Sequence, residues 1–85
     1  MDYVDIFLNF YSMKYVHKNK FKEVRIIKLY DCYVDYCDNE IFLTKEQFCE
    51  KVFILLKISN YEENKSYKRV VKIYGSNLKK KIEEN

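Results

Sequence analysis

Three cysteines and one histidine are the side chains of this 85-residue chain best suited to bind a metal. Cys32 and Cys37 lie on an expected helix at a spacing that points them about 140° away from each other. A structural zinc site needs ligands that converge, and its cysteines are commonly spaced as C-x2–4-C. We therefore expect Cys32, Cys37 and Cys49 to be ordinary, mostly buried thiols and His17 to lie on the surface. No metal and no other cofactor is expected.

The acidic row Asp31, Asp35 and Asp38 could in principle hold a cation, because it recurs along one side of the same expected helix. A solvated acidic face is the more common outcome of such a row. Catalysis needs convergent groups, and the chain has one histidine, one glycine and no Gly-rich loop. No second candidate base lies near a cysteine to activate it. We expect a protein that is not an enzyme.

The basic residues are distributed unevenly along the chain. Residues 1–43 hold six Lys/Arg and seven Asp/Glu, a net charge of −1, whereas residues 44–85 hold ten and six, a net charge of +4. Between Asn64 and Ile82 there are seven basic residues and no acidic one. Such a segment favours phosphate contact through counterion release, although the same lysines could simply solvate a surface strand and protect its edge. The lysine-rich composition is also typical of AT-rich coding, which weakens the argument from charge alone.

A helix-start signal stands at residues 43–48. The Thr44 side chain can accept from the N–H of Gln47 while Gln47 reaches back to Thr44, and Leu43 with Phe48 forms a hydrophobic staple. We expect a helix from Lys45 to about Lys57. Its predicted apolar face is Phe48, Cys49, Val52, Leu55 and Leu56. Its opposite face is Gln47, Glu50, Lys51, Ile54 and Lys57, with Ile54 as an apolar exception.

The remaining elements follow from periodicity and turn residues. A helix is expected over residues 2–17, capped by Asp2, with Tyr3, Ile6, Phe7, Phe10, Met13 and Lys14 at 3-4 spacing. A short strand is expected over 23–27, a helix over 28–37, and a strand over 67–74 that Gly75 interrupts. The order helix, strand, helix, helix, strand, turn, strand predicts an α+β winged helix-turn-helix. Its three helices would pack with a small antiparallel sheet carrying a basic wing.

We expect one domain over residues 1–85, with residues 79–85 as a candidate flexible tail. The nine tyrosines and six phenylalanines can bury much surface in so short a chain. The longest apolar runs are far below the roughly 18–20 residues of a membrane span, and no signal peptide is recognisable. The sequence therefore predicts a soluble, cytoplasmic protein.

If the winged-helix prediction holds, each basic or polar residue has a candidate role in binding DNA, duplex in preference to single-stranded. Thr44, Lys45 and the free N–H groups of that helix start would meet a phosphate. Gln47 and Lys51 would reach base edges in the major groove. The predicted wing would follow the phosphate backbone with Lys65, Lys68, Arg69 and Lys72. Glu46 and Glu50 argue against tight groove binding, because they repel phosphate. For every one of these residues the alternative is an ordinary solvated side chain.

From Leu29 onward the chain resembles the C-terminal winged-helix module of poxvirus-type primase–helicases of viruses, phages and plasmids. The family pattern is Leu-Tyr-x-x-Tyr-x-x-Trp-Cys, then Leu-Ser/Thr-x-x-x-Phe, then a basic strand that ends in an aromatic residue and Gly. The matching residues are Leu29, Tyr30, Tyr33, Tyr36, Cys37, Leu43, Thr44, Phe48 and the segment from Tyr67 to Gly75. Tyr36 replaces the usual Trp, and Ser76 stands where an apolar residue often follows the Gly.

The resemblance covers about half of the chain and implies a DNA-binding accessory domain of DNA replication in a virus or mobile element. It implies neither ATPase nor primase activity, because the motifs of those activities are missing. Two other functions fit the same fold: a protein–protein interaction module that uses Ile54 and exposed tyrosines, and a small regulatory factor that dimerises through the first helix. For the DNA-binding module, a replication protein is the second candidate partner beside DNA.

Overall fold

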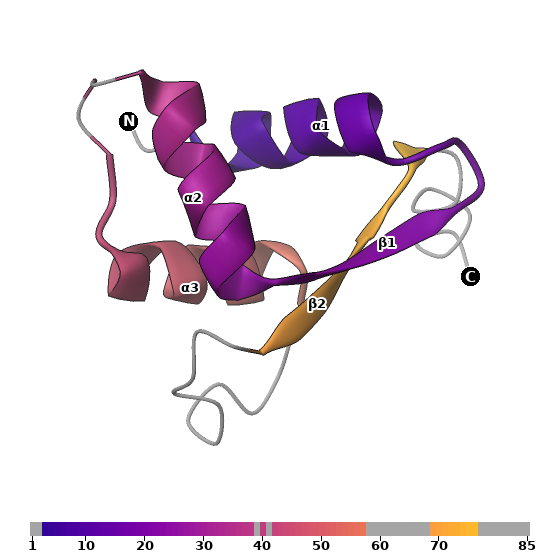
Figure 1. The fold of residues 1–85 in the computed structure, drawn as a ribbon. Helices are drawn as coiled ribbons and strands as arrows, with labels where there is room; N and C mark the ends of the chain where they lie inside the picture. The colour runs from indigo at the N-terminus through magenta and orange to yellow at the C-terminus, as the bar shows by residue number, and fades with distance from the viewer. Residues whose placement is uncertain (1–2, 39, 41, 58–68, 77–85) are drawn as a thin grey trace.

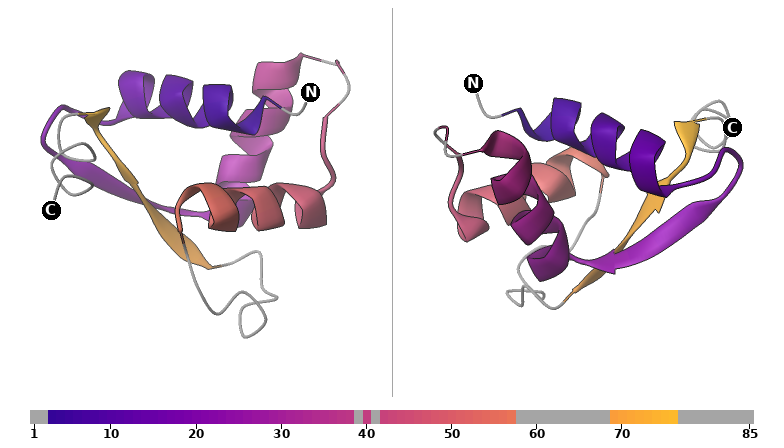
Figure 2. Two further views of the ribbon diagram at one scale, coloured as in Figure 1. Left: turned by 180° about the vertical axis from the view of Figure 1, so that it is seen from behind. Right: turned by 45° about the horizontal axis from the view of Figure 1, so that its top comes forward.

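The computed structural model describes residues 3–38, 40, 42–57 and 69–76. In chain order these residues form α1 (Val4–Tyr15), β1 (Phe21–Arg25), α2 (Ile26–Cys37), α3 (Lys45–Leu55) and β2 (Val70–Tyr74) (Figure 1). The helices cross one another at one end of the molecule, and the two strands run between the base of α2 and the end of α1 (Figures 1 and 2). Within the described residues this is a small α+β architecture of three helices and a two-stranded antiparallel sheet. It is compatible with a winged helix.

The two strands pair in an antiparallel register that runs from Phe21 opposite Tyr74 to Arg25 opposite Val70. The predicted early strand was displaced by two residues, since Ile26 and Ile27 belong to α2. Ile26 is fully buried and its N–H donates to the Arg69 carbonyl oxygen at 2.9 Å. Burial of Ile26 in the helical layer therefore outweighs the preference of a β-branched residue for a strand.

The predicted start of α3 is confirmed. Thr44 has extended backbone angles, its hydroxyl accepts from the N–H of Gln47 at 3.2 Å, and its own N–H donates to Gln47 Oε1 at 3.1 Å. The helix ends at Leu55, two residues before the predicted end. Lys57 adopts a left-handed conformation with φ 56°, which stops the helix.

The core is built from aromatic side chains of all three helices. Phe7, Tyr33 and Phe48 are fully buried, and the ring centroids of Tyr33 and Phe48 lie 4.7 Å apart. The tyrosines of α2 also fix the segment that leads into α3. The Tyr30 hydroxyl donates to the Leu43 carbonyl oxygen at 2.9 Å, and the Leu43 N–H donates to the Tyr33 hydroxyl at 3.0 Å. The position of the α3 start therefore depends on α2 as well as on its own cap.

The predicted apolar face of α1 was wrong in most of its members. The helix buries Val4, Phe7, Leu8 and Tyr11, whereas it leaves the other predicted residues exposed. These exposed residues are Tyr3, Ile6, Phe10, Met13 and Lys14. Both sets recur at helical spacing, so the periodicity could not identify the buried one. The expected cap, Asp2, lies outside the described residues.

Gly75 ends β2 as predicted, and it does so at a close contact between distant segments. A Cβ atom at this position would overlap the backbone carbonyl of His17. The Gly75 N–H donates to the Lys20 carbonyl oxygen at 2.8 Å, which ties the end of β2 to the turn before β1. The first part of the predicted 67–74 strand, the strand expected after Gly75 and the tail at 79–85 lie outside the described residues.

Candidate nucleic-acid interface

The residues predicted on α3 lie together at its N-terminal half. Thr44, Lys45 and Gln47 are exposed, and Lys51 is half-buried one turn further along. The capping box occupies the Thr44 hydroxyl and Gln47 Oε1, so only the amide nitrogen of Gln47 is left to address a base edge. Ile54 is 65% exposed on the same side of the helix, as its position in the sequence predicted.

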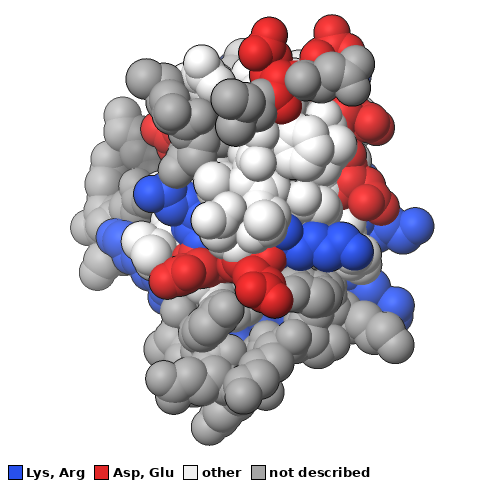
Figure 3. Space-filling model, turned by 90° about the vertical axis from the view of Figure 1, so that its left-hand side faces the viewer, with Lys and Arg blue, Asp and Glu red and all other residues white. Residues whose placement is uncertain are grey.

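Acidic residues lie on α3 and on α2, on the same side of the molecule as this helix start. Glu46 and Glu50 are exposed on α3, and the row Asp31, Asp35 and Asp38 is exposed from the middle of α2 to its C-cap. Figure 3 views the side on which α2 ends and α3 begins, and acidic groups border an uncharged centre there with lysines between them. The N-terminal end of α3 attracts anions through its free N–H groups, but the carboxylates reduce that attraction.

Arg69 is directed into the molecule instead of into solvent. Its guanidinium carbon lies 5.2 Å from the centroid of the Phe53 ring, and its Nη1 atom is buried with no hydrogen-bond partner in the described part of the chain. Its carbonyl oxygen accepts from Ile26. Arg69 therefore links the start of β2 to α3 and α2, which is a structural role that the sequence did not reveal.

Lys72 is exposed on β2, directly opposite Glu23 on β1. Its ammonium nitrogen lies 5.0 Å from the centroid of the Phe21 ring. The described site residues thus fall into two groups, one at the N-terminal half of α3 and one on the ribbon, which stand apart in Figure 1. Lys65 and Lys68 lie outside the described residues.

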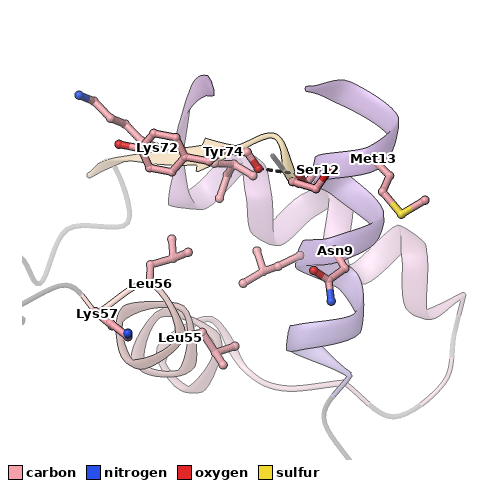
Figure 4. A pocket seen from close by; sticks show the side chains of 11 residues that line it. Asn9, Ser12, Met13, Leu55, Leu56, Lys57, Lys72 and Tyr74 are labelled. Atoms are coloured by element: carbon pink, nitrogen blue, oxygen red, sulfur yellow. Dashed lines mark hydrogen bonds between the residues drawn. The ribbon is translucent and has the colours of Figure 1, made fainter. Parts of the chain in front are cut away.

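A groove of about 550 Å³ opens between α1, the end of α3 and β2 (Figure 4). Leu55 and Leu56 reach into it from α3, while the Lys72 ammonium points away from it. The Ser12 hydroxyl donates to the Tyr74 carbonyl oxygen at 2.6 Å on the opposite wall. The lining of the groove is mostly apolar. It consists of Leu8, Asn9, Ser12, Met13, Leu55, Leu56, Lys57, Lys72, Ile73, Tyr74 and Ser76.

A second basic surface, which the sequence analysis missed, lies around the turn from α1 to β1. The ammonium groups of Lys14 and Lys22 each lie 5.3 Å from the centroid of the exposed Tyr15 ring. Lys18 and Lys20 are exposed in the turn itself. A signal for it was present, because residues 6–22 contain four lysines and no acidic residue. Counting charge over the whole first half of the chain concealed it.

The three cysteines are free thiols, with Cys37 and Cys49 buried and Cys32 half-buried. Burial raises the pKa of the Cys49 thiol from 9.0 to about 11, so this group stays protonated and unreactive near neutral pH. Among the residues that the structure describes, no three His, Cys, Asp or Glu side chains form a group that could hold a metal ion.

Neither the models of known protein families, nor the curated proteins, nor the solved structures gave a match to this chain. In the described part of the chain, no helix has the length and apolar character needed to cross a bilayer.

Proposed function

We propose that this protein is a non-enzymatic winged-helix module that binds duplex DNA. The observation that carries the proposal is the capped start of α3, which buries Phe48 and Cys49. On the other side of the helix Lys45 and Gln47 are exposed and Lys51 is half-buried. The helix, strand, helix, helix, strand order is the second support, because in a winged helix it places a capped helix before a basic β-hairpin. In this proposal α3 docks in or beside a major groove.

The predicted wing supplies the electrostatic part of the mechanism. Lys65 and Lys68 remain predicted phosphate contacts, and Lys72 is the exposed member of the set on β2. Arg69 is better suited to hold the wing base against Phe53 than to meet a phosphate. The resemblance to primase–helicases supports a role in the replication of a virus or mobile element.

The proposal predicts that duplex affinity falls linearly with salt on logarithmic axes, with a slope of roughly −4 to −5 for about four to six phosphate contacts. Fluorescence anisotropy with a labelled duplex at several salt concentrations measures the slope. Replacement of Lys68 by Glu should lower the affinity and make the slope shallower by at least about one. Replacement of Lys51 by Gln should lower the affinity and relax the preference at the base pair that it contacts.

Lys28→Gln is the matched control, because Lys28 is exposed on α2 and belongs to neither group. Arg69 should not be used for this test, since its loss would also disturb packing against Phe53. Affinity that does not change with salt, or an equal effect of all three substitutions, would contradict the proposal.

A second candidate function is protein–protein interaction, including dimerisation of a small regulatory factor through α1. The observation in its favour is the exposed apolar row Ile6, Phe10 and Met13 on that helix, with Ile54 exposed on α3. Rows of this kind on small proteins commonly mark contact surfaces.

A further inference from the structure

The turn between α1 and β1 carries a concentrated positive charge with aromatic side chains inside it. Lys14, Lys18, Lys20 and Lys22 are all exposed, and strand pairing places Lys72, opposite Glu23, on the same face of the ribbon as Phe21. Lys22 lies on the other face, beside Tyr15 of α1, so the lysines and rings occupy both faces of the ribbon at this end. The turn lies beside the end of β2 in each ribbon view (Figures 1 and 2). We call these five lysines together with Tyr15 and Phe21 the basic–aromatic surface.

Two rings of this surface are about half open to solvent. Tyr15 is 45% exposed and Phe21 is 49% exposed. Lysine ammonium groups lie 5.0 to 5.3 Å from the centroids of these rings, from Lys14 and Lys22 at Tyr15 and from Lys72 at Phe21. Single-stranded nucleic-acid sites combine aromatic rings with basic groups. Here the ammonium groups lie over the rings, and they would move from the rings to phosphates when a base stacks.

The rings are supported from beneath, which limits their conformational freedom. Tyr15 packs on the buried Tyr11 with centroids 4.8 Å apart, and Phe21 packs on Tyr74 at 5.8 Å. The turn between them is fixed by two backbone hydrogen bonds, from Lys20 to His17 and from Gly75 to Lys20. A preordered platform loses little conformational entropy when a base stacks on it.

The charge pattern also defines where this surface ends. The nearest acidic residues in the sequence are Asp5, near the start of α1, and Glu23, which faces Lys72 across the ribbon. Phosphates are therefore attracted to the turn, and Glu23 weakens that attraction beside Lys72. In a duplex the base faces are covered by stacking, so the two rings would have no function there, whereas a single strand can present its bases to them.

We propose that the basic–aromatic surface binds single-stranded DNA, with bases stacked on Tyr15 and Phe21 and phosphates held by the surrounding lysines. The choice of DNA over RNA rests on the proposed function. The site itself is separate from α3 and the predicted wing. One chain would then hold duplex and single strand on different surfaces.

The absence of tryptophan from the chain allows a direct test. In the Phe21→Trp variant the indole is the only one present, and stacking of a base on it should quench its emission when oligo(dT) is added. Phe42→Trp is the control, because Phe42 is similarly exposed at 42% but precedes α3, away from the turn. Quenching at position 21 and none at position 42 is the expected result, and equal quenching at both would overturn the proposal.

Loss of affinity gives the second measurement. Tyr15→Ala and Phe21→Ala should each weaken oligo(dT) binding roughly tenfold while duplex affinity is unchanged. Lys18→Gln combined with Lys20→Gln should make the salt slope for oligo(dT) shallower by about 1.4, because each phosphate neutralised on a single strand accounts for roughly 0.7 of the slope. Circular dichroism of each variant establishes that the fold is retained, and Phe21→Trp keeps a large ring should Phe21→Ala disturb the sheet.

The duplex experiment separates this proposal from the proposed function. Lys68→Glu should weaken duplex binding without changing oligo(dT) binding. Tyr15→Ala and Phe21→Ala should weaken oligo(dT) binding without changing duplex binding. Oligo(dT) affinity that is insensitive to both ring substitutions would overturn the single-strand site even if duplex binding behaves as expected. Tighter binding of oligo(U) than of oligo(dT) would overturn its assignment to DNA.

Discussion

At the scale of single residues, chemical type was a poor guide to role. Arg69 was grouped with the lysines because it is cationic, yet its guanidinium lies over the Phe53 ring at the start of the strand. Gln47 was assigned to base recognition, yet its amide oxygen closes the cap of α3. Because its Oε1 accepts the hydrogen bond of the cap, Gln47 can offer a base only its amide nitrogen. The capping interaction was predictable from the sequence because it depends on positions three residues apart.

The buried thiol of Cys49 makes a prediction about alkaline stability. Its pKa is about 11 in the folded protein and near 9.0 when exposed, so between these values the unfolded chain releases a proton that the folded chain retains. The contribution of the protonated thiol to the free energy of unfolding should therefore be fully present below pH 9 and decrease as the pH rises toward 11. Denaturant titrations of the protein and of Cys49→Ala across this range measure the effect.

The Cys49→Ala variant should show a smaller decrease over that range, although its stability at pH 7 is lower because the smaller side chain leaves a cavity. Burial also raises the pKa of Tyr30, with Asp31 and Cys37 adding to the shift, so part of the decrease should persist. Identical pH dependence of the two proteins would contradict a buried, protonated Cys49.

At the scale of elements, the start of α3 and the break at Gly75 could be read from the sequence, because each depends on local chemistry. The face of α1 could not be read, since two apolar rows share its helical period and only the neighbouring helices select one of them. The predicted end of β1 was wrong for the same reason. Val24, Ile26 and Ile27 have similar propensities, and the boundary is set by the burial of Ile26 and its bond to Arg69.

Gly75 should be intolerant of any side chain, for a reason that is not conformational. Its φ is not positive, but a Cβ atom would overlap the His17 carbonyl, so the turn or the strand must move. We expect Gly75→Ala to lower the free energy of unfolding by about 1–3 kcal/mol, as overpacking typically does. Ser76→Ala is the matched control, because Ser76 is exposed and should change stability by less than about 0.5 kcal/mol.

At the scale of the whole molecule, the candidate sites differ in how far the sequence disclosed them. The positive second half of the chain was evident from counting, and it led to α3 and the predicted wing. The basic–aromatic surface was not evident from the sequence, because Lys72 reaches Phe21 only through the pairing of strands that are about 50 positions apart. Long-range pairing of this kind is what a single sequence reports least well.

The exposed row on α1 predicts self-association if the second candidate function is correct. Ile6, Phe10 and Met13 offer an apolar strip, and a dimer would bury it against a second copy. Sedimentation velocity over a range of concentrations should then show a monomer–dimer equilibrium that Met13→Glu abolishes. Ile54→Asp is the comparison on α3. A concentration-independent monomer would leave the row without a role in dimerisation.

The contact of Gly75 with the turn has a consequence for the order of events in folding. Lys72 meets Phe21, and Gly75 holds the turn, only when β2 has paired with β1. A ligand of that surface would bind the closed form alone, and should slow hydrogen exchange of the amides at Lys20 and Gly75 as occupancy rises. The pairing of β1 with β2 would then be stabilised by the ligand whose site it completes.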